Sequence, residues 1–382
     1  MSLIADPPLM DVSDTTPPRP KGSADSPLRL CTTMTFPDVG LRRRRRLVRL
    51  GFIGVGFAAL LLSACSNSSG PSRSAHQNAT GEATCPLSGV RPPTGGVPNR
   101  PAMAVKVDNY PTARPQSGLD KADVVFEQPV EGGITRYVAV FQCDDSSLIG
   151  PVRSARSIDI GILGQLAHPL LVHVGGIDPV LRDIVASPLV NVDLGQSRSL
   201  VIHHAGRVAP YATYTSTALV YGAHPDMTTP PHPLFTYSDT TPTGSAVSTV
   251  SINYSSTSNV TWRYSLSTHT FQRFYNGTTP DRLENGAQNT AANVVVQYVQ
   301  ITYGPWVENS QGALEVRADL YPDASGDAVV YRDGVAVPGT WHRSTLGSPT
   351  QFIDRSGKQI PLRPGQTWVE IVPNTIRTTT TP

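Results

Sequence analysis

Residues 131–159 read EGGITRYVAVFQCDDSSLIGPVRSARSID and combine a turn, a strand and several charged side chains. The triplet Glu131-Gly132-Gly133 predicts a tight turn, because glycine adopts backbone angles that other residues avoid. The apolar run 134–143 that follows is typical of a strand, and a similar run, 122–130, precedes the turn. We therefore predict that these two runs form a β-hairpin.

Two arginines, Arg153 and Arg156, stand three residues apart near the end of this stretch. Residues 154–167 have the apolar spacing of a helix, and Ser154 is a suitable cap for it. Both guanidinium groups would then lie at the positive end of a helix, where an anion is stabilised. We interpret this region as an anion-binding site formed by Arg114, Glu131, Arg136, Arg153 and Arg156. The same side chains also fit an internal lattice of ion pairs that fixes loops, and the sequence leaves both interpretations open.

The segment 99–235 mixes strand patterns with helical ones. Residues 102–109 and 169–176 are typical of strands, because they are rich in β-branched and apolar side chains. Residues 178–186 begin with Asp and Pro, which is a common start of a helix. We therefore predict an α+β domain for this segment.

Beyond it, residues 236–246 have the composition of a linker, and the segment 247–373 contains many short strand patterns separated by turns. We therefore predict that residues 247–373 form a mainly-β domain with a sandwich- or barrel-like fold, followed by a tail at 374–382. Asp333-Gly334 predicts the turn of a hairpin within it. Six aromatic side chains of this segment suit either a platform that stacks on sugars or a core: Tyr264, Phe271, Phe274, Tyr275, Trp341 and Trp368.

The front of the chain has the pattern of an exported protein. The basic run LRRRRRLVRL at 41–50 is followed by the apolar stretch GFIGVGFAALLLSAC at 51–65. This order is typical of a secretory signal, and the apolar part is shorter than the roughly 20 residues of a membrane-spanning helix. The last four residues, LSAC, resemble the lipobox of bacterial lipoproteins, whose cysteine receives a diacylglyceryl group and palmitate.

Cys65 would then begin the mature protein and hold it at the membrane through its lipid. Residues 1–64 are interpreted as a leader and lipoprotein signal peptide, with Met34 as the hypothetical start of translation. Residues 65–98 are largely polar and predict a flexible tether. The alternative is an ordinary signal peptide or an uncleaved anchor, in which Cys65 is incidental.

The remaining cysteines and the charges fit an extracytoplasmic protein. Cys31 falls in the leader, which leaves Cys85 and Cys143 as an even pair for an oxidising compartment. We predict a disulfide between these two, with two unrelated thiols as the alternative. The net charge of +2 arises from the arginine run in the leader, so nothing in the rest of the chain favours a nucleic-acid partner.

Motifs of catalysis and of metal binding are not evident. His203 and His204 are adjacent and would point to opposite faces of a strand, and there is no P-loop or Gly-x-Ser-x-Gly elbow. We therefore predict no catalytic residue, no metal site and no cofactor. The enzymatic alternative is an envelope hydrolase of glycan or peptide, with Glu127 or Glu131 as the acid–base residue. It requires two free carboxylates roughly 5–10 Å apart in an open cleft.

Several stretches carry a resemblance, in the same order along the chain: RPAMAVKVDN (100–109), ARPQSGLDKADVVFE (113–127), EGGITRYVAVF (131–141), GPVRSARSID (150–159), YRDGVAVPGTW (331–341) and IPLRPGQTWVEIVP (360–373). Together they resemble the YerB family of bacterial lipoproteins, a family of unknown function, over residues 99–373. The resemblance implies a surface-anchored protein of two domains and no known reaction. Tyr211 and Ala212 stand where many family members have a His-Asn pair. If that histidine is catalytic in the family, this chain lacks the catalytic residue.

These observations predict an extracytoplasmic lipoprotein, anchored to the cell membrane by the diacylglyceryl lipid on Cys65. We expect it to bind or regulate a component of the cell envelope, such as a wall polymer or a wall-synthesis protein. A passive spacer is a third interpretation, and it predicts no concave pocket near the arginines.

Overall fold

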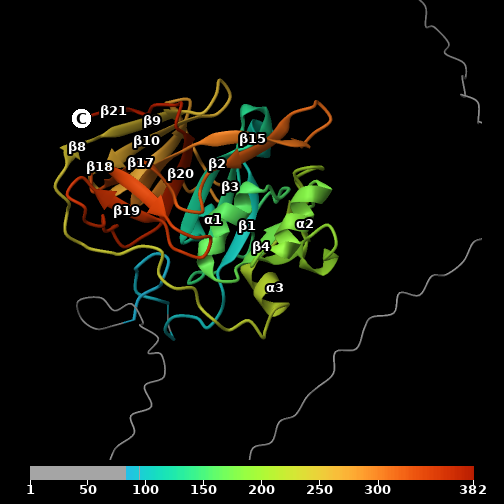
Figure 1. Ribbon diagram of the computed structural model, residues 1–382. Coiled ribbons are helices and arrows are strands. Elements are labelled where there is room, and N and C mark those ends of the chain that lie inside the picture. The colour runs from blue at the N-terminus through green and yellow to red at the C-terminus, as the bar shows by residue number, and fades with distance from the viewer. Residues whose placement is uncertain (1–82, 94) are drawn as a thin grey trace, which may run out of the picture. The chain divides into compact units, whose positions relative to one another are not determined.

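An eleven-stranded mixed sheet runs through the residues that this computed structural model describes, 83–93 and 95–382 (Figure 1). From one edge to the other its strands are β19 (Gln351–Asp354), β18 (Val335–Arg343), β17 (Ala324–Arg332), β14 (Asn293–Val299), β20 (Thr367–Pro373), β2 (Val124–Pro129), β3 (Thr135–Phe141), β1 (Met103–Asp108), β4 (Leu170–His173) and β5 (Val190–Asp193), with β8 (Ser245–Ala246) paired to β18. The leader and Cys65 lie outside the described residues.

Both predicted segments contribute strands to this one sheet. Strand β2 from the first segment pairs in parallel with β20 from the second, so that Glu127 lies level with Glu370. The predicted linker 236–246 supplies β8, which pairs with β18. Residues from 83 onward accordingly belong to a single compact unit, in which the two segments share a sheet.

The central strands are buried because each face of the sheet carries a hydrophobic core. Side chains alternate between the two faces of a strand. Along β1, Ala104 joins the core beside the helix α1 (Ile158–Leu163), whereas Met103 and Val105 join the core on the opposite face. This burial on both faces explains why β1 and β3 read as almost continuous apolar runs.

A second sheet of six strands packs against the core opposite α1. It contains β12 (Thr279–Pro280), β11 (Thr270–Tyr275), β10 (Asn259–Ser265), β9 (Thr249–Asn253) and β21 (Thr379–Thr381), with β13 (Thr290–Ala291) paired to β11. Trp262 of β10 meets Trp368 of β20 edge-on, with ring centroids 5.2 Å apart. The prediction of a mainly-β second segment is therefore confirmed.

The first segment is mainly β as well, so the predicted α+β class is not confirmed. Its helices are short: α1, α2 (Asp178–Ala186) and α3 (Thr217–Gly222). The helix expected from residue 154 begins only at Ile158, because Val152 bridges Val107 and the Arg153 N–H donates to Lys106 O at 2.9 Å. These contacts with β1 keep the preceding residues extended. No helix in the described part of the chain is long and apolar enough to cross a bilayer.

Both predicted hairpins are confirmed. Strands β2 and β3 pair in antiparallel register, and their turn is the 3₁₀ segment η3 (Glu131–Gly133). Strands β17 and β18 are joined at Asp333 and Gly334, whose φ angles of 53° and 71° suit a tight hairpin turn.

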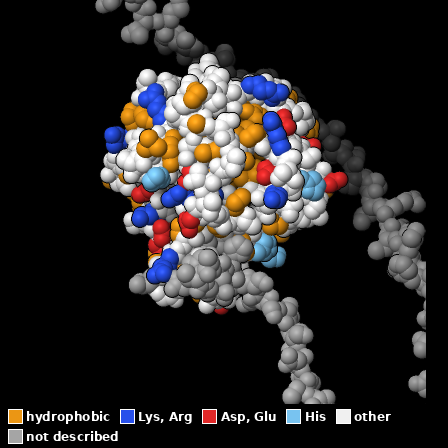
Figure 2. Space-filling model, turned by 90° about the vertical axis from the view of Figure 1, so that its left-hand side faces the viewer, with side chains coloured by type: hydrophobic (Ala, Val, Ile, Leu, Met, Phe, Trp, Pro, Cys, Tyr) orange, Lys and Arg blue, Asp and Glu red, His pale blue; other side chains and the backbone are white. Residues whose placement is uncertain are grey.

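Most of the aromatic side chains form cores and not a platform. Phe271, Tyr275, Trp341 and Trp368 are buried, so the sugar-stacking interpretation is wrong for these four. On the face drawn in Figure 2, apolar side chains appear as scattered groups, and basic and acidic side chains are interspersed.

Two further antiparallel pairs lie outside the large sheets: β6 (Ile202–His203) with β7 (Thr213–Tyr214), and β15 (Ile301–Val307) with β16 (Leu314–Ala318). The β15–β16 hairpin follows directly after β14, and β16 contacts η3 and α1 (Figure 1). It therefore lies over the end of the sheet where β2 turns into β3.

Candidate functional site

Charged side chains gather on the α1 face of the sheet, near the turn between β2 and β3. The alternation of β1 places Lys106 and Asp108 on the same face as Ala104, and Arg136 shares its face with Val138 of the same core. We call the following eight residues the charged cluster: Lys106, Arg136, Arg153, Arg156, Asp108, Glu131, Asp159 and Glu308. Its four cations and four carboxylates balance in charge.

The strongest pair of the cluster joins Arg156 to Glu131. Arg156 Nε donates to Glu131 Oε2 at 2.8 Å, and Arg156 Nη2 donates to Glu131 Oε1. Arg136 Nη2 lies 3.5 Å from the same Oε1 atom. Burial opposes the ionisation of Glu131, but the two guanidinium groups outweigh it and lower the pKa of Glu131 to about 2. The carboxylate is thus held ionised and fully engaged.

Lys106 and Asp159 form a second, deeper pair. Lys106 Nζ lies 2.7 Å from Asp159 Oδ1, and both side chains are fully buried. Asp159 also accepts hydrogen bonds from Gln128 Nε2 at 2.9 Å and from the backbone N–H of Arg156 at 2.8 Å. Burial lowers the pKa of Lys106 to about 8, although Asp159 opposes this shift. This pair fixes the start of α1 against β1.

Arg153 lies at the rim of the cluster. Its Nε atom is 2.8 Å from Asp108 Oδ2, and 27% of its side chain is exposed. The guanidinium carbon lies 5.9 Å from the ring centroid of Tyr211. Arg153 is therefore the arginine of the charged cluster that is best placed to meet a partner from solvent.

Four of the five predicted anion-site residues meet in the cluster, and Arg114 does not. Arg114 Nη2 donates to Asn109 O at 2.8 Å, and its guanidinium lies 3.5 Å from the ring centroid of Tyr275. The sequence prediction omitted Lys106 and Glu308. A lysine inside an apolar strand was a usable hint, whereas nothing in the local sequence connects Glu308 with Arg156.

Glu127, the other carboxylate of the hydrolase alternative, is buried between the two sheets and locked by its partners. Its Oε2 atom lies 2.6 Å from Arg273 Nη2, and its Oε1 atom accepts a hydrogen bond from Thr135 Oγ1 at 2.6 Å. Arg273 Nη1 also pairs with Asp281 Oδ2 at 2.6 Å. Neither Glu127 nor Glu131 is a free carboxylate in an open cleft, so the geometry favours binding or structure over acid–base catalysis.

Glu370 lies next to this buried group and is fully buried. Trp262 Nε1 donates to Glu370 Oε1 at 2.8 Å, and Tyr254 Oη donates to Oε2 at 2.8 Å. Burial, followed by the charge of Glu127, raises the pKa of Glu370 to about 8. This acid therefore favours its protonated form inside the folded protein.

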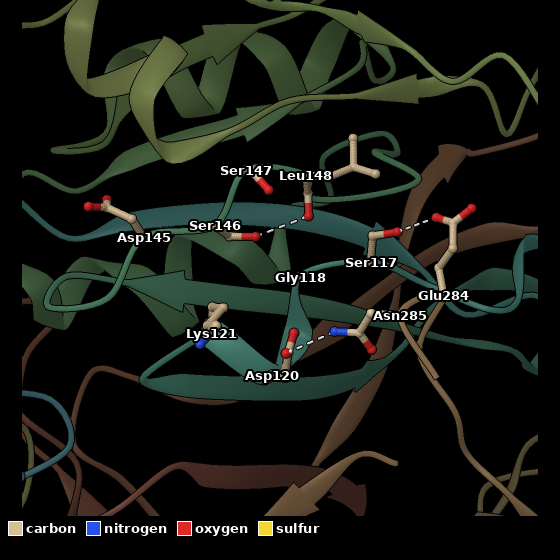
Figure 3. A pocket seen from close by; sticks show the side chains of 10 residues that line it. All are labelled: Ser117, Gly118, Asp120, Lys121, Asp145, Ser146, Ser147, Leu148, Glu284 and Asn285. Atoms are coloured by element: carbon tan, nitrogen blue, oxygen red, sulfur yellow. Dashed lines mark hydrogen bonds between the residues drawn. The ribbon is translucent and has the colours of Figure 1, made fainter. Parts of the chain in front are cut away.

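A separate pocket of about 370 Å³ lies at the surface and is drawn in Figure 3. It is lined by Ser117, Gly118, Asp120, Lys121, Asp145, Ser146, Ser147, Leu148, Glu284 and Asn285. Its polar groups largely bond to one another or to neighbours: Glu284 accepts from Ser117 Oγ at 2.5 Å and pairs with His204 Nε2 at 2.7 Å. Among the described residues, no group of three or more His, Cys, Asp or Glu side chains is placed to hold a metal ion.

The predicted disulfide between Cys85 and Cys143 is present, with Cα atoms 6.0 Å apart. Asp123 supports the same end of β3, because its Oδ2 atom accepts the backbone N–H groups of Gln142 at 2.7 Å and of Cys143 at 3.1 Å. His173 is a buried core histidine bonded to Gly175 O and Asn191 Oδ1.

Comparison with known proteins gives consistent matches. Residues 87–228 match the family described as "Protein of unknown function (DUF3048) N-terminal domain", and residues 250–369 match its C-terminal domain. "Putative lipoprotein YerB" of Bacillus subtilis (strain 168) is 30% identical over 303 residues, which cover 76% of this chain and 86% of that protein. The crystal structure of the YerB protein from Bacillus subtilis is similar with a TM-score of 0.66 at 26% identity, covering 78% of this chain and 100% of that one.

Proposed function

The chain belongs to the DUF3048 family of proteins of unknown function, and from this premise we propose that it is a membrane-anchored lipoprotein that binds an anionic component of the cell envelope. The observation that carries the proposal is the charged cluster, in which three arginines converge and one of them, Arg153, reaches solvent. Arginine suits this role because its planar donors match carboxylate and phosphate groups.

The location rests on separate observations. The LSAC motif at 62–65 supports a lipid anchor on Cys65, and the relative in Bacillus subtilis is named a lipoprotein. The disulfide between Cys85 and Cys143 suits a compartment outside the cytoplasm. A protein so anchored meets wall polymers and wall-synthesis proteins, and the wall polymers are rich in anionic groups.

Binding is favoured over hydrolysis by the state of the acids. Glu131 is held by Arg156, and Glu127 is held by Arg273, so neither is free to exchange a proton with a substrate. Arg153 remains available to a ligand. It pairs with one carboxylate, that of Asp108, and part of its side chain is in contact with solvent.

Co-sedimentation of the purified full chain with cell-wall fragments tests the proposal. We expect Arg153→Ala to weaken binding severalfold and to reduce its dependence on salt, because exposed charges are screened by ions. Arg182→Ala, at an exposed arginine of α2, is the matched control and should bind like the original chain. Equal binding by all three proteins would contradict a role of the charged cluster in recognition.

A further inference from the structure

Glu308 reaches the charged cluster from the loop that joins β15 to β16. Its side chain is 1% exposed, and its Oε2 atom lies 3.3 Å from Arg156 Nε. Neither carboxylate oxygen of Glu308 has a hydrogen-bond partner. A buried carboxylate is normally satisfied by several donors, so this acid fits its place poorly.

Arg156 makes no hydrogen bond to Glu308, because Nε, the atom nearest Glu308, has a single N–H and donates it to Glu131. Its Nε and Nη2 atoms donate to Glu131, and its Nη1 atom donates to Ala155 O at 2.8 Å. The contact with Glu308 is therefore an ion pair without a hydrogen bond. Burial accordingly raises the pKa of Glu308, although Arg156 opposes the shift.

Arg136, in contrast, has a buried donor without an acceptor. It is 3% exposed, and its Nε atom is buried without an acceptor. Its Nη1 atom makes one hydrogen bond, to Ser154 O at 3.3 Å. The cluster thus contains an unused donor on Arg136 and two unused acceptor atoms on Glu308, which the hairpin does not bring together.

The β15–β16 hairpin is joined to the main sheet by no strand pairing among the described residues. Each of its strands pairs with the other and with no third strand among the described residues. Its outer side leaves Tyr303, Val307 and Leu314 exposed, at 70%, 51% and 44% of their surface. Displacing it would break no ladder of the eleven-stranded sheet.

Removal of Glu308 would leave the cluster with four cations and three carboxylates. One negative charge restores the balance, which favours a monoanion such as a carboxylate over a phosphate dianion. A small carboxylate is also free to orient towards Arg136, whereas Glu308 is fixed by the hairpin through its N–H bond to Ala313 O at 2.8 Å.

We propose that Arg136 and Arg156 form a binding site for the carboxylate of a ligand, and that Glu308 occupies this site as an internal substitute until the hairpin moves. The proposal rests on the proposed function and gives its ligand a chemical class. The apparent affinity for the ligand is then reduced, because only the molecules in which Glu308 has left the site can bind the ligand.

Isothermal titration calorimetry of the purified full chain with sodium acetate tests this site. We expect Glu308→Gln to bind acetate on the order of tenfold more tightly than the original chain. Asp319→Asn, which removes an exposed acid at the base of the same hairpin, is the control and should leave the affinity unchanged. The double variant Glu308→Gln with Arg136→Gln should lose the gain.

An equal acetate affinity of Glu308→Gln and the original chain would overturn the proposal, and so would tighter binding of inorganic phosphate, at a pH where it is a dianion, than of acetate. Thermal melting of each variant shows whether it is folded, and Glu308→Ala repeats the test if Glu308→Gln is not. If Glu308→Gln does not bind acetate more tightly, but binding to wall fragments still depends on Arg153, then the carboxylate site is refuted. The proposed function is not affected by that result.

Discussion

Glu370 makes the stability of the protein depend on pH in an unusual direction. The carboxyl group ordinarily ionises near pH 4.5 but has a pKa of about 8 in the folded protein, because it is fully buried beside Glu127. Between these values the folded state binds a proton that the unfolded state has released. The free energy of unfolding therefore falls as the pH rises from about 4.5 to about 8. At about 1.4 kcal/mol for each pKa unit, the raised pKa of Glu370 corresponds to a loss on the order of a few kcal/mol.

Glu370→Gln removes this ionisation and keeps a hydrogen-bonding group at both positions. The amide oxygen accepts from Trp262 Nε1, and the amide nitrogen donates to Tyr254 Oη, which reverses the bond that Tyr254 Oη donates to Glu370 Oε2. We expect the variant to exceed the original chain in stability at pH 8, by on the order of a few kcal/mol. The difference should shrink by about 1.4 kcal/mol for each pH unit as the pH falls towards 5.

Urea unfolding followed by tryptophan fluorescence between pH 5 and pH 9 measures the difference. Glu370→Leu is the control, since it also lacks the ionisation but loses both hydrogen bonds, which costs about 1–3 kcal/mol for each partner left unsatisfied. Both variants should show the same reduced slope with pH, at different absolute stabilities. A difference between Glu370→Gln and the original chain that stays constant across this range would refute the reasoning.

Three further predictions concern the hairpin turn, the ion pairs between the sheets and the anchor. Gly334→Ala should lower the melting temperature more than Gly286→Ala, because both glycines have positive φ but only a Cβ at 334 meets a neighbouring ring, at 2.8 Å. Arg273→Met should lower the free energy of unfolding by about 3–5 kcal/mol in urea, because two buried carboxylates lose their cation. Cys65→Ala should move the protein from the membrane to the soluble fraction in cell fractionation, and retention in the membrane would contradict a lipid anchor.

The strands and turns were predictable because their determinants are local. The alternation around Asp333-Gly334 and the glycines after Glu131 specify hairpins within a few residues of the chain. The disulfide was also predictable, because two cysteines remained once the leader and the lipobox were set aside. Turn residues were sufficient to predict the hairpins, and the expected oxidising compartment was sufficient to predict the disulfide.

The helix at 154–167 was overestimated because its apolar spacing competes with contacts that lie far away in the sequence. Val152 bridges Val107, and the next residue donates to β1, so the backbone stays extended to the edge of α1. The apolar spacing indicates the helical preference of the segment, but it does not indicate that β1 lies beside the segment and pairs with it. The same limit explains why the sharing of one sheet by the two segments was not foreseen.

The candidate site was predictable in part for a similar reason. Glu131, Arg136, Arg153 and Arg156 follow one another within a short stretch, so a hairpin and a return to β1 suffice to bring them together. Glu308 comes from a hairpin much later in the chain, and its burial depends on how that hairpin folds over the cluster. No short-range pattern carries that information.

The pairing of β2 with β20 has a consequence for how the protein is made. β20 begins at Thr367, far along the chain from β2, which ends at Pro129, yet it lies in the sheet between β14 and β2. One edge of β2 therefore stays unpaired until the chain has been made as far as residue 373. The folding of both segments is thereby tied to the arrival of β20, and an unpaired β2 edge in an incomplete chain is a natural target for chaperones.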